Sequence, residues 1–286
     1  IEFVADSGTV TFGGSVTGTP ATALVDANKI IINGDGGDDT VTLGHTGGVP
    51  SFTFDGVTHV LYPNTTMFEF NGGGGDDALV VSYAGGNPIP TGGLIYDGGA
   101  QGPNGDRLAF FGNGNTASYQ PSATTAGAGK VTVSGRTVDF TGLEPVDITG
   151  MATVNITPAG ADDVLTVANG FDFATGAIPA LRISGTTNGV PIETVALWNN
   201  TTVSINTSTN NGNDTITIAS ANNAHGIAHF NIVTGTGTDK IDVNGPVVVT
   251  GDVNFASQQI NLANSISAMN VALNAGAGAI ADLNAA

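Results

Sequence analysis

The chain has 286 residues, of which only 10% are charged, and it combines 43 glycines with a formal net charge of −18 at pH 7. This negative charge repels phosphate backbones and anionic lipid headgroups, which argues against nucleic acid as a partner. The absence of cysteine excludes disulfides, thiolate metal sites and cysteine nucleophiles.

The remaining composition predicts strands and turns. Thr, Val and Ile favour strands, whereas Gly, Asn, Asp and Ser favour turns. No long segment has a 3.6-residue apolar period. Residues 253–281 carry no charge, but Asn, Gln and Ser interrupt them every few positions, so no membrane insertion is expected. The chain begins without a basic and apolar leader, which predicts a segment of a larger exported precursor.

The first recurring unit comprises two short alternating strands around a Gly/Asp turn. Residues 30–32 lead into the turn 33–39 and then into 41–43. Residues 68–70, 71–77 and 79–81 repeat this pattern without a gap.

Four weaker copies follow along the chain. Their strand pairs are 94–96 with 106–108, 154–156 with 162–167, 203–205 with 214–218, and 230–232 with 239–243. In every copy an Asp begins the second strand, and these residues are Asp39, Asp77, Asp106, Asp163, Asp214 and Asp239. Because the spacing varies while the turn recurs, we predict a parallel β-solenoid, a β-helix or β-roll, with loop insertions of variable length.

The C-terminal region has a more regular repeat. At an offset of 18 residues, Val253 matches Val271, Phe255 matches Leu273 and Leu262 matches Ile280, whereas Ile260 matches Gly278. We therefore predict two regions, an irregular Gly/Asp-turn region at 1–243 and more regular solenoid coils at 244–286.

Tandem β-sandwiches are the alternative architecture, because several short strands between turn signals also suit that fold. The strand–turn–strand unit, found six times, favours the solenoid. A single Trp and the absence of Cys also exclude a Cys/Trp/Cys sandwich core.

The Gly/Asp turns at 34–41, 72–79 and 97–99 resemble those of large bacterial surface and secreted proteins of the RTX and filamentous-haemagglutinin-like groups. Residues 137–146 resemble a linker sequence of the same exoproteins. The resemblance implies a parallel β-roll or β-helix, export from the cell, and a role in adhesion or in the surface layer. It implies no reaction.

The best candidate metal site is the first turn, where Asn33, Asp35, Asp38 and Asp39 offer oxygen ligands for Ca²⁺. Asp76 and Asp77 form a weaker candidate, because adjacent side chains on a strand point to opposite faces. In the alternative interpretation these residues cap tight turns through bonds from backbone N–H groups. RTX calcium sites use tandem nine-residue repeats, whereas each turn here stands alone.

Other chemistries have weaker signals. His225 and His229 have a zinc-ligand spacing but lie in a loop-forming sequence, which predicts solvated side chains. The pair Asp162 and Asp163 could serve a hydrolase, but the same pair recurs at the other turns, which favours a structural role. Trp198 could stack on a sugar, whereas core packing is predicted for Phe52, Phe54, Tyr62, Phe68, Phe70, Phe110 and Phe111.

We therefore predict no enzyme but a structural repeat protein, extracellular or on a bacterial cell surface, forming part of a fibre, filament or surface layer. Its partners would be further repeats or further copies, since residues 275–286 carry only one charged side chain to protect a terminal coil. The alternatives are an adhesin module that binds glycans or a host surface, and a carbohydrate-active enzyme on a β-helix.

Overall fold

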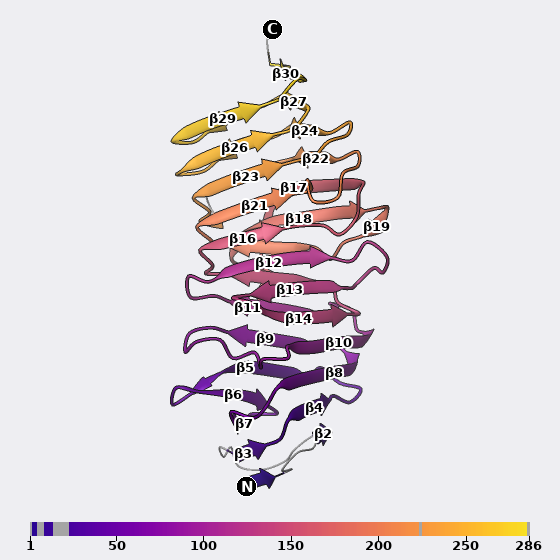
Figure 1. Cartoon of the computed structure of the whole chain (residues 1–286), viewed down its shortest axis with the longest axis vertical. Helices are drawn as coiled ribbons and strands as arrows, with labels where there is room; N and C mark the ends of the chain where they lie inside the picture. The colour runs from indigo at the N-terminus through magenta and orange to yellow at the C-terminus, as the bar shows by residue number, and fades with distance from the viewer. Residues whose placement is uncertain (1, 5–8, 14–22, 223–224, 285–286) are drawn as a thin grey trace. The chain divides into compact units, whose positions relative to one another are not determined.

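A computed structural model describes residues 2–4, 9–13, 23–222 and 225–284 (Figure 1). These residues form thirty β-strands and no α-helix. The predicted all-β class is therefore confirmed. The strands follow the alternation of the sequence: in β4 (Lys29–Asn33), Ile30 and Ile32 are buried, while the intervening residues are partly exposed.

The chain divides into two compact units. Unit 1 comprises Ile1–Asn113 and Gly127–Val146, and unit 2 comprises Gly114–Ala126 and Asp147–Ala286. The predicted boundary after Val243 stays a prediction.

Unit 1 contains strands of two mainly parallel sheets. In the first, the strand order is β1 (Glu2–Val4), β3 (Ala23–Asp26), β7 (Val57–Leu61), β6 (Val49–Phe54), β5 (Thr40–Thr46), β9 (Ala78–Ser82) and β11 (Arg107–Phe111). In the second, it is β2 (Thr9–Gly13), β4, β8 (Met67–Gly75), β10 (Leu94–Gln101), β14 (Arg136–Thr141) and β13 (Gly129–Val133).

Unit 2 also has two large sheets and a small one. The first runs β15 (Val146–Thr149), β20 (Val195–Trp198), β18 (Pro179–Thr187), β17 (Asp163–Phe171), β22 (Thr215–Ile218), β24 (Lys240–Val243), β27 (Gln259–Leu262) and β30 (Ala279–Asp282), with β19 (Val190–Pro191) paired to β18. The second runs β12 (Thr116–Pro121), β16 (Thr153–Ile156), β21 (Thr202–Asn206), β23 (His229–Val233), β26 (Asp252–Ala256) and β29 (Asn270–Asn274). The small sheet pairs β25 (Val247–Val248) with β28 (Ile266–Ser267).

The predicted repeat alignment is confirmed by the strand register within each unit. In unit 1, Ile30 pairs with Phe68, and Phe68 pairs with Leu94. In unit 2, Val154, Val203 and Phe230 follow one another across β16, β21 and β23, which lie side by side in Figure 1. From β21 onward, apart from β25 and β28 of the small sheet, the chain alternates between the two large sheets, and each strand pairs in parallel with the next strand of its own sheet.

Insertions between repeats form antiparallel strands, whereas we had predicted loops. In unit 1, β6 pairs antiparallel with both β5 and β7. Gly47 and Gly48 connect β5 to β6 with φ values of +61° and +81°, the two positive φ angles that a type I′ hairpin turn requires. In unit 2, β18 pairs antiparallel with β17 and β20. The inserted segments therefore extend the sheets.

The C-terminal alignment is correct for one strand and wrong for the other. Val253 pairs with Val271, and Phe255 pairs with Leu273, at the predicted offset of 18 residues. Ile260, however, pairs with Ile280 instead of Gly278. The turn before β30 is longer by two residues than the turn before β27, which shifts the second strand.

The core of each unit consists of the inward-facing residues of its sheets. Phe70 and Tyr96 stack with ring centroids 5.0 Å apart in unit 1, and Phe230 and Phe255 meet edge to face at 5.6 Å in unit 2. Full burial of one such side chain stabilises the fold by about 1.5–3 kcal/mol.

Candidate functional site

The recurrent aspartates lie where the chain enters the first large sheet. Asp39, Asp77 and Asp106 directly precede β5, β9 and β11 in unit 1. In unit 2, Asp163 begins β17, while Asp214 and Asp239 directly precede β22 and β24. Asp39 is partly buried, and the side chains of the other five are buried. Buried carboxylates require hydrogen-bond donors, so their partners define the site.

These aspartates form a ladder in each unit, which we call the inner ladder. In unit 1, the backbone N–H of Asp39 donates to Oδ1 of Asp77, and that of Asp77 donates to Oδ1 of Asp106, both at 2.8 Å. In unit 2, the N–H of Asp163 donates to Asp214 at 3.0 Å, and that of Asp214 donates to Asp239 at 2.9 Å. The carboxylates of Asp77, Asp106, Asp214 and Asp239 thus each accept the N–H of the equivalent residue in the preceding repeat.

The residues directly before these aspartates form a second ladder, which we call the outer ladder. Its hydrogen bonds run in the opposite direction along the chain. Oδ1 of Asp38 accepts the N–H of Asp76 at 2.8 Å in unit 1. In unit 2, Oδ1 of Asp162 accepts the N–H of Asn213 at 2.8 Å, and Oδ1 of Asn213 accepts the N–H of Thr238 at 2.9 Å. Consecutive N–H groups of a parallel strand point to opposite neighbours. Two side-chain ladders of opposite direction therefore satisfy both.

Glycines make room for the inner ladder in unit 1. A Cβ on Gly72 would collide with the Asp77 carboxylate and the Gly98 carbonyl. A Cβ on Gly98 would lie 2.5 Å from Oδ2 of Asp106. These carboxylates consequently fill the space that a side chain would otherwise occupy.

Burial raises the pKa of the inner-ladder carboxyls. The pKa values of Asp77 and Asp163 rise to about 6 through desolvation, with a smaller contribution from neighbouring carboxylates. The hydrogen bond from the N–H of Asp39 offsets part of this rise at Asp77, whereas both side-chain oxygens of Asp163 lack a hydrogen-bond partner among the described residues. Desolvation also raises the pKa values of Asp106 and Asp214. Within the described residues, Oδ2 of Asp77 and of Asp106 has no hydrogen-bond partner.

The predicted calcium residues make side-chain contacts within this network. Oδ1 of Asp35 accepts the N–H of Gly37 at 2.8 Å, and Oδ2 of Asp39 accepts the N–H of Asp35 at 2.8 Å. Oδ1 of Asn33 accepts from the amide of Asn71 at 2.9 Å. No group of three or more His, Cys, Asp or Glu side chains placed to hold a metal occurs in the described ranges. Calcium at Asn33, Asp35, Asp38 and Asp39, or at Asp76 and Asp77, stays a prediction.

Two predictions about individual side chains were wrong. Trp198 is only 3% exposed and packs with Ala180, Ala196 and Phe173, because it lies on a strand of the unit 2 sheet. His225 is 2% exposed, so it is not solvated. Of the aromatics predicted in the core, Phe52, Phe54, Phe68, Phe70 and Phe110 are fully buried, Tyr62 is partly buried, and Phe111 is 39% exposed.

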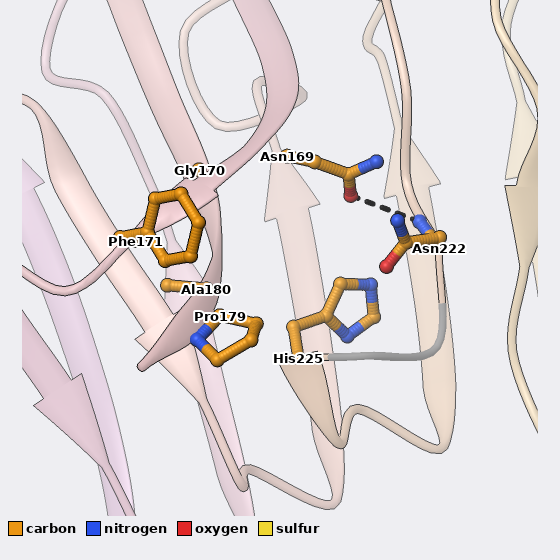
Figure 2. Close-up of a pocket in the computed structure, with 7 residues that line it drawn as sticks. All are labelled: Asn169, Gly170, Phe171, Pro179, Ala180, Asn222 and His225. Atoms are coloured by element: carbon orange, nitrogen blue, oxygen red, sulfur yellow. Dashed lines mark hydrogen bonds between the residues drawn. The ribbon is translucent and has the colours of Figure 1, made fainter. Parts of the chain in front are cut away.

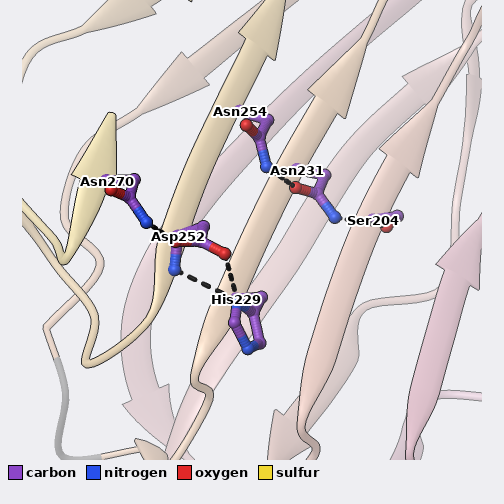
Figure 3. Close-up of polar contacts among 6 residues, drawn as sticks. All are labelled: Ser204, His229, Asn231, Asp252, Asn254 and Asn270. Atoms are coloured by element: carbon purple, nitrogen blue, oxygen red, sulfur yellow. Dashed lines mark hydrogen bonds and ion pairs between the residues drawn. The ribbon is translucent and has the colours of Figure 1, made fainter. Parts of the chain in front are cut away.

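His229 lies at the start of β23, on a polar face of unit 2 (Figure 3). Its Nδ1 lies 3.2 Å from Oδ2 of Asp252, whose Oδ1 accepts from Asn270. In the neighbouring row, the Asn254 amide donates to Asn231, and the Asn231 amide donates to Ser204. Outward side chains therefore also connect successive strands.

A pocket of about 280 Å³ lies in unit 2 (Figure 2). Phe171 of β17 and Pro179 and Ala180 of β18 form one side. The other side is formed by Asn169, Asn222 and His225. Sequence reasoning missed this pocket, because its walls come from a hairpin and from a loop about 45 residues later whose burial no local pattern indicates.

Comparison with known proteins found no match to a protein-family model, a curated protein or a solved structure. Among the described residues, no helix has the length and apolar character needed to cross a membrane.

Proposed function

We propose that the chain is a parallel β-solenoid that serves as a structural module of a bacterial cell-surface or secreted repeat protein. The pair of aspartate ladders is the observation that carries this proposal. Buried carboxylates at enzyme sites face substrate, whereas Asp77, Asp106 and Asp214 each accept a backbone N–H of the preceding repeat. These carboxylates therefore link neighbouring repeats through hydrogen bonds.

The parallel register supports the same proposal. Strands of one sheet stack repeat on repeat, so that each repeat buries the inward residues of its neighbour. Ile216 and Ile241, for example, pair in register and are fully buried. Stability is then a sum of contacts between neighbouring repeats, which suits a spacer or a fibre.

The strands β29 and β30 favour self-association as the mode of assembly. Val271 and Ile280 occupy the register positions of Val253 and Ile260, which are fully buried. Val271 and Ile280 themselves are 46% and 48% exposed. We propose that a further repeat, of the same polypeptide or of a second copy, covers these core-register positions.

Light scattering across protein concentration, with electron microscopy, tests this assembly. We expect elongated particles whose mass rises with concentration, and V271K to abolish the rise. The matched control is V164K, at a valine that is 53% exposed on β17. A monodisperse monomer at every concentration, or equal effects of the two variants, would contradict end-on assembly.

Location and catalysis need separate tests. Antibody labelling of intact cells of the source organism should detect the protein at the surface or in the medium, whereas labelling only after lysis would contradict this location.

A polysaccharide turnover assay should detect no product. Product formation that D162N or D163N abolishes would favour the carbohydrate-active enzyme instead.

A further inference from the structure

A second pocket, of about 250 Å³, lies in unit 1 on the outward face of the first large sheet. Gly44 follows the buried Leu43 on β5 and therefore faces outward, in register with Ser51 of β6. A Cβ on Gly44 would contact only Ser82 of β9, 3.8 Å from its Cβ. The glycine thus leaves a gap between side chains, which we call the hydroxyl pocket. It is lined by Thr42, Gly44, His45, Thr46, Ser51, Thr53, Ser82, Ala84 and Gly85.

The hydroxyl pocket offers free hydroxyl groups to a ligand. Thr42 and Ser82 are partly exposed, and within the described residues their hydroxyls have no hydrogen-bond partner. The hydroxyls of Thr46 and Ser51 bond each other at 3.0 Å. A hydroxyl donates one hydrogen bond and accepts two. The lining therefore matches ligand groups that also both donate and accept, as hydroxyls do.

The lining of the hydroxyl pocket carries no ionised side chain. His45 is the titratable residue of this lining, and burial lowers its pKa, which keeps the ring neutral at physiological pH. Along β5, β6 and β9 the nearest charged residue lies at least four residues from Gly44, Ser51 and Ser82, which is about 13 Å. An ionised ligand would lose hydration without gaining a counter-charge. The hydroxyl pocket therefore suits a neutral ligand.

An exposed aromatic residue lies beside the hydroxyl pocket. Phe111 of β11 is the register partner of Ser82, so both side chains project from the same face of the sheet, on strands about 4.8 Å apart. Phe111 is 39% exposed. An exposed aromatic ring offers a flat apolar surface, and the C–H face of a pyranose ring is a flat apolar surface of similar size.

We propose that the hydroxyl pocket binds a neutral pyranose residue of a glycan. The C–H face of the sugar packs against Phe111, and its hydroxyls exchange hydrogen bonds with Thr42 and Ser82. The pocket volume lies just below the range of about 300–1,000 Å³ that holds drug-sized ligands, which fits a single ring. This binding function goes beyond the structural role and does not depend on it.

An NMR titration of the ¹⁵N-labelled protein with methyl β-D-glucopyranoside tests the proposal. The backbone amides of Gly44 and Ser82 should shift, with a Kd on the order of 1 mM. Mannitol carries its hydroxyls on a flexible open chain without a ring face, so it should bind at least about tenfold more weakly. Unmoved amides at Gly44 and Ser82, or equal affinities for the two compounds, would overturn the proposal.

A pair of phenylalanine variants provides the first control. F111A should weaken binding of the glucoside by about tenfold, because packing on the ring is lost. F171A removes a ring of similar exposure, 50%, from β17 of unit 2 and should leave the Kd unchanged. Both positions are exposed, so both variants should fold. Equal affinities for the two variants would overturn the proposal while leaving the structural function untouched.

Filling the hydroxyl pocket provides an independent test. At Gly44 an added Cβ has only ordinary contacts, and Val favours strands, so G44V should fold. Its side chain occupies the space of the sugar, and the affinity should fall at least about tenfold. The control G36A, at a position with no atom within 4 Å of a Cβ, should keep the affinity of the unmutated protein. Undiminished binding by G44V would overturn the proposal.

Discussion

The two units differ at the inward-facing residue that lies opposite the inner-ladder aspartates. In unit 1 this position, two residues after the last inward strand residue, is glycine at 34, 72 and 98. In unit 2 it is Pro158, Thr207, Thr234 and Ser257. Thr207 donates its hydroxyl to Oδ2 of Asp214 at 2.6 Å, whereas Oδ2 of Asp77 in unit 1 and Oδ2 of Asp239 in unit 2 have no partner among the described residues. The inner ladder thus needs only one carboxylate oxygen, and the Thr207 hydroxyl satisfies the other one at Asp214.

The largest expected effect comes from filling the glycine position of unit 1. G72A should destabilise the fold by about 3 kcal/mol, because the added Cβ meets both the Asp77 carboxylate and a backbone carbonyl. The control is G36A, since no atom lies within 4 Å of a Cβ at Gly36. Urea unfolding measures both. Similar midpoints for the two variants would contradict close packing of the carboxylate against Gly72.

Removing the hydroxyl in unit 2 should have the next largest effect. T207V leaves Oδ2 of Asp214 buried without its donor, which should lower the free energy of unfolding by about 1–3 kcal/mol at pH 7. It should also raise the pKa of Asp214 further, because the hydroxyl bond now lowers it. Thr125, which lies in an exposed turn, gives the control T125V. A loss that T125V shares would show that the Thr207–Asp214 bond contributes nothing specific.

Much of this arrangement could be predicted from the sequence, but its bonding could not. Alternating apolar residues and the recurrent Asp predicted that residues 30–32, 68–70 and 94–96 are equivalent, and the register confirms it. The same Asp-Asp pairs left turn capping and calcium binding both open. The direction of each ladder depends on whether a given backbone N–H points to the preceding or to the following repeat. This can be known only from the strand register in the folded structure.

The missed features have local physical causes. Asp55-Gly56 and Asn188-Gly189 have the two positive φ angles of hairpin turns and are the dipeptides that favour such turns. The sequence therefore contained the signal for antiparallel insertions. The burial of His225 had no such signal, because Phe171 and Pro179, which line the same pocket, come from a distant hairpin.

Acidity should stabilise the fold, chiefly through Asp77 and Asp163. Their folded pKa values of about 6 lie above the ordinary value near 3.8. Stability from these groups is therefore fully present below about pH 4 and is lost as the pH rises through 6. D77N should raise the free energy of unfolding by about 1–2 kcal/mol at pH 7 and leave it unchanged at pH 4. The measurement is unfolding at both pH values. If D77N stabilised the protein equally at pH 7 and at pH 4, the Asp77 carboxylate would not be a destabilising buried charge at neutral pH.

Calcium at the first turn is expected to have the smallest effect. If Asn33, Asp35, Asp38 and Asp39 bind the ion, added calcium raises the melting temperature by mass action. The double variant D38N/D39N should then weaken this rise. A melting temperature of the unmutated protein that calcium leaves unchanged would leave turn capping as the role of these residues.

Native-state hydrogen exchange measured by NMR tests the inner ladder most directly. The backbone amides of Asp39, Asp77, Asp163 and Asp214 each donate to a carboxylate of the next repeat, so they should exchange as slowly as the amides of the central strands. The exposed Gly36 provides the fast reference in the same turn as Asp39. Exchange of the four aspartate amides at the rate of Gly36 would contradict the account, because the carboxylates would then not hold the repeats together.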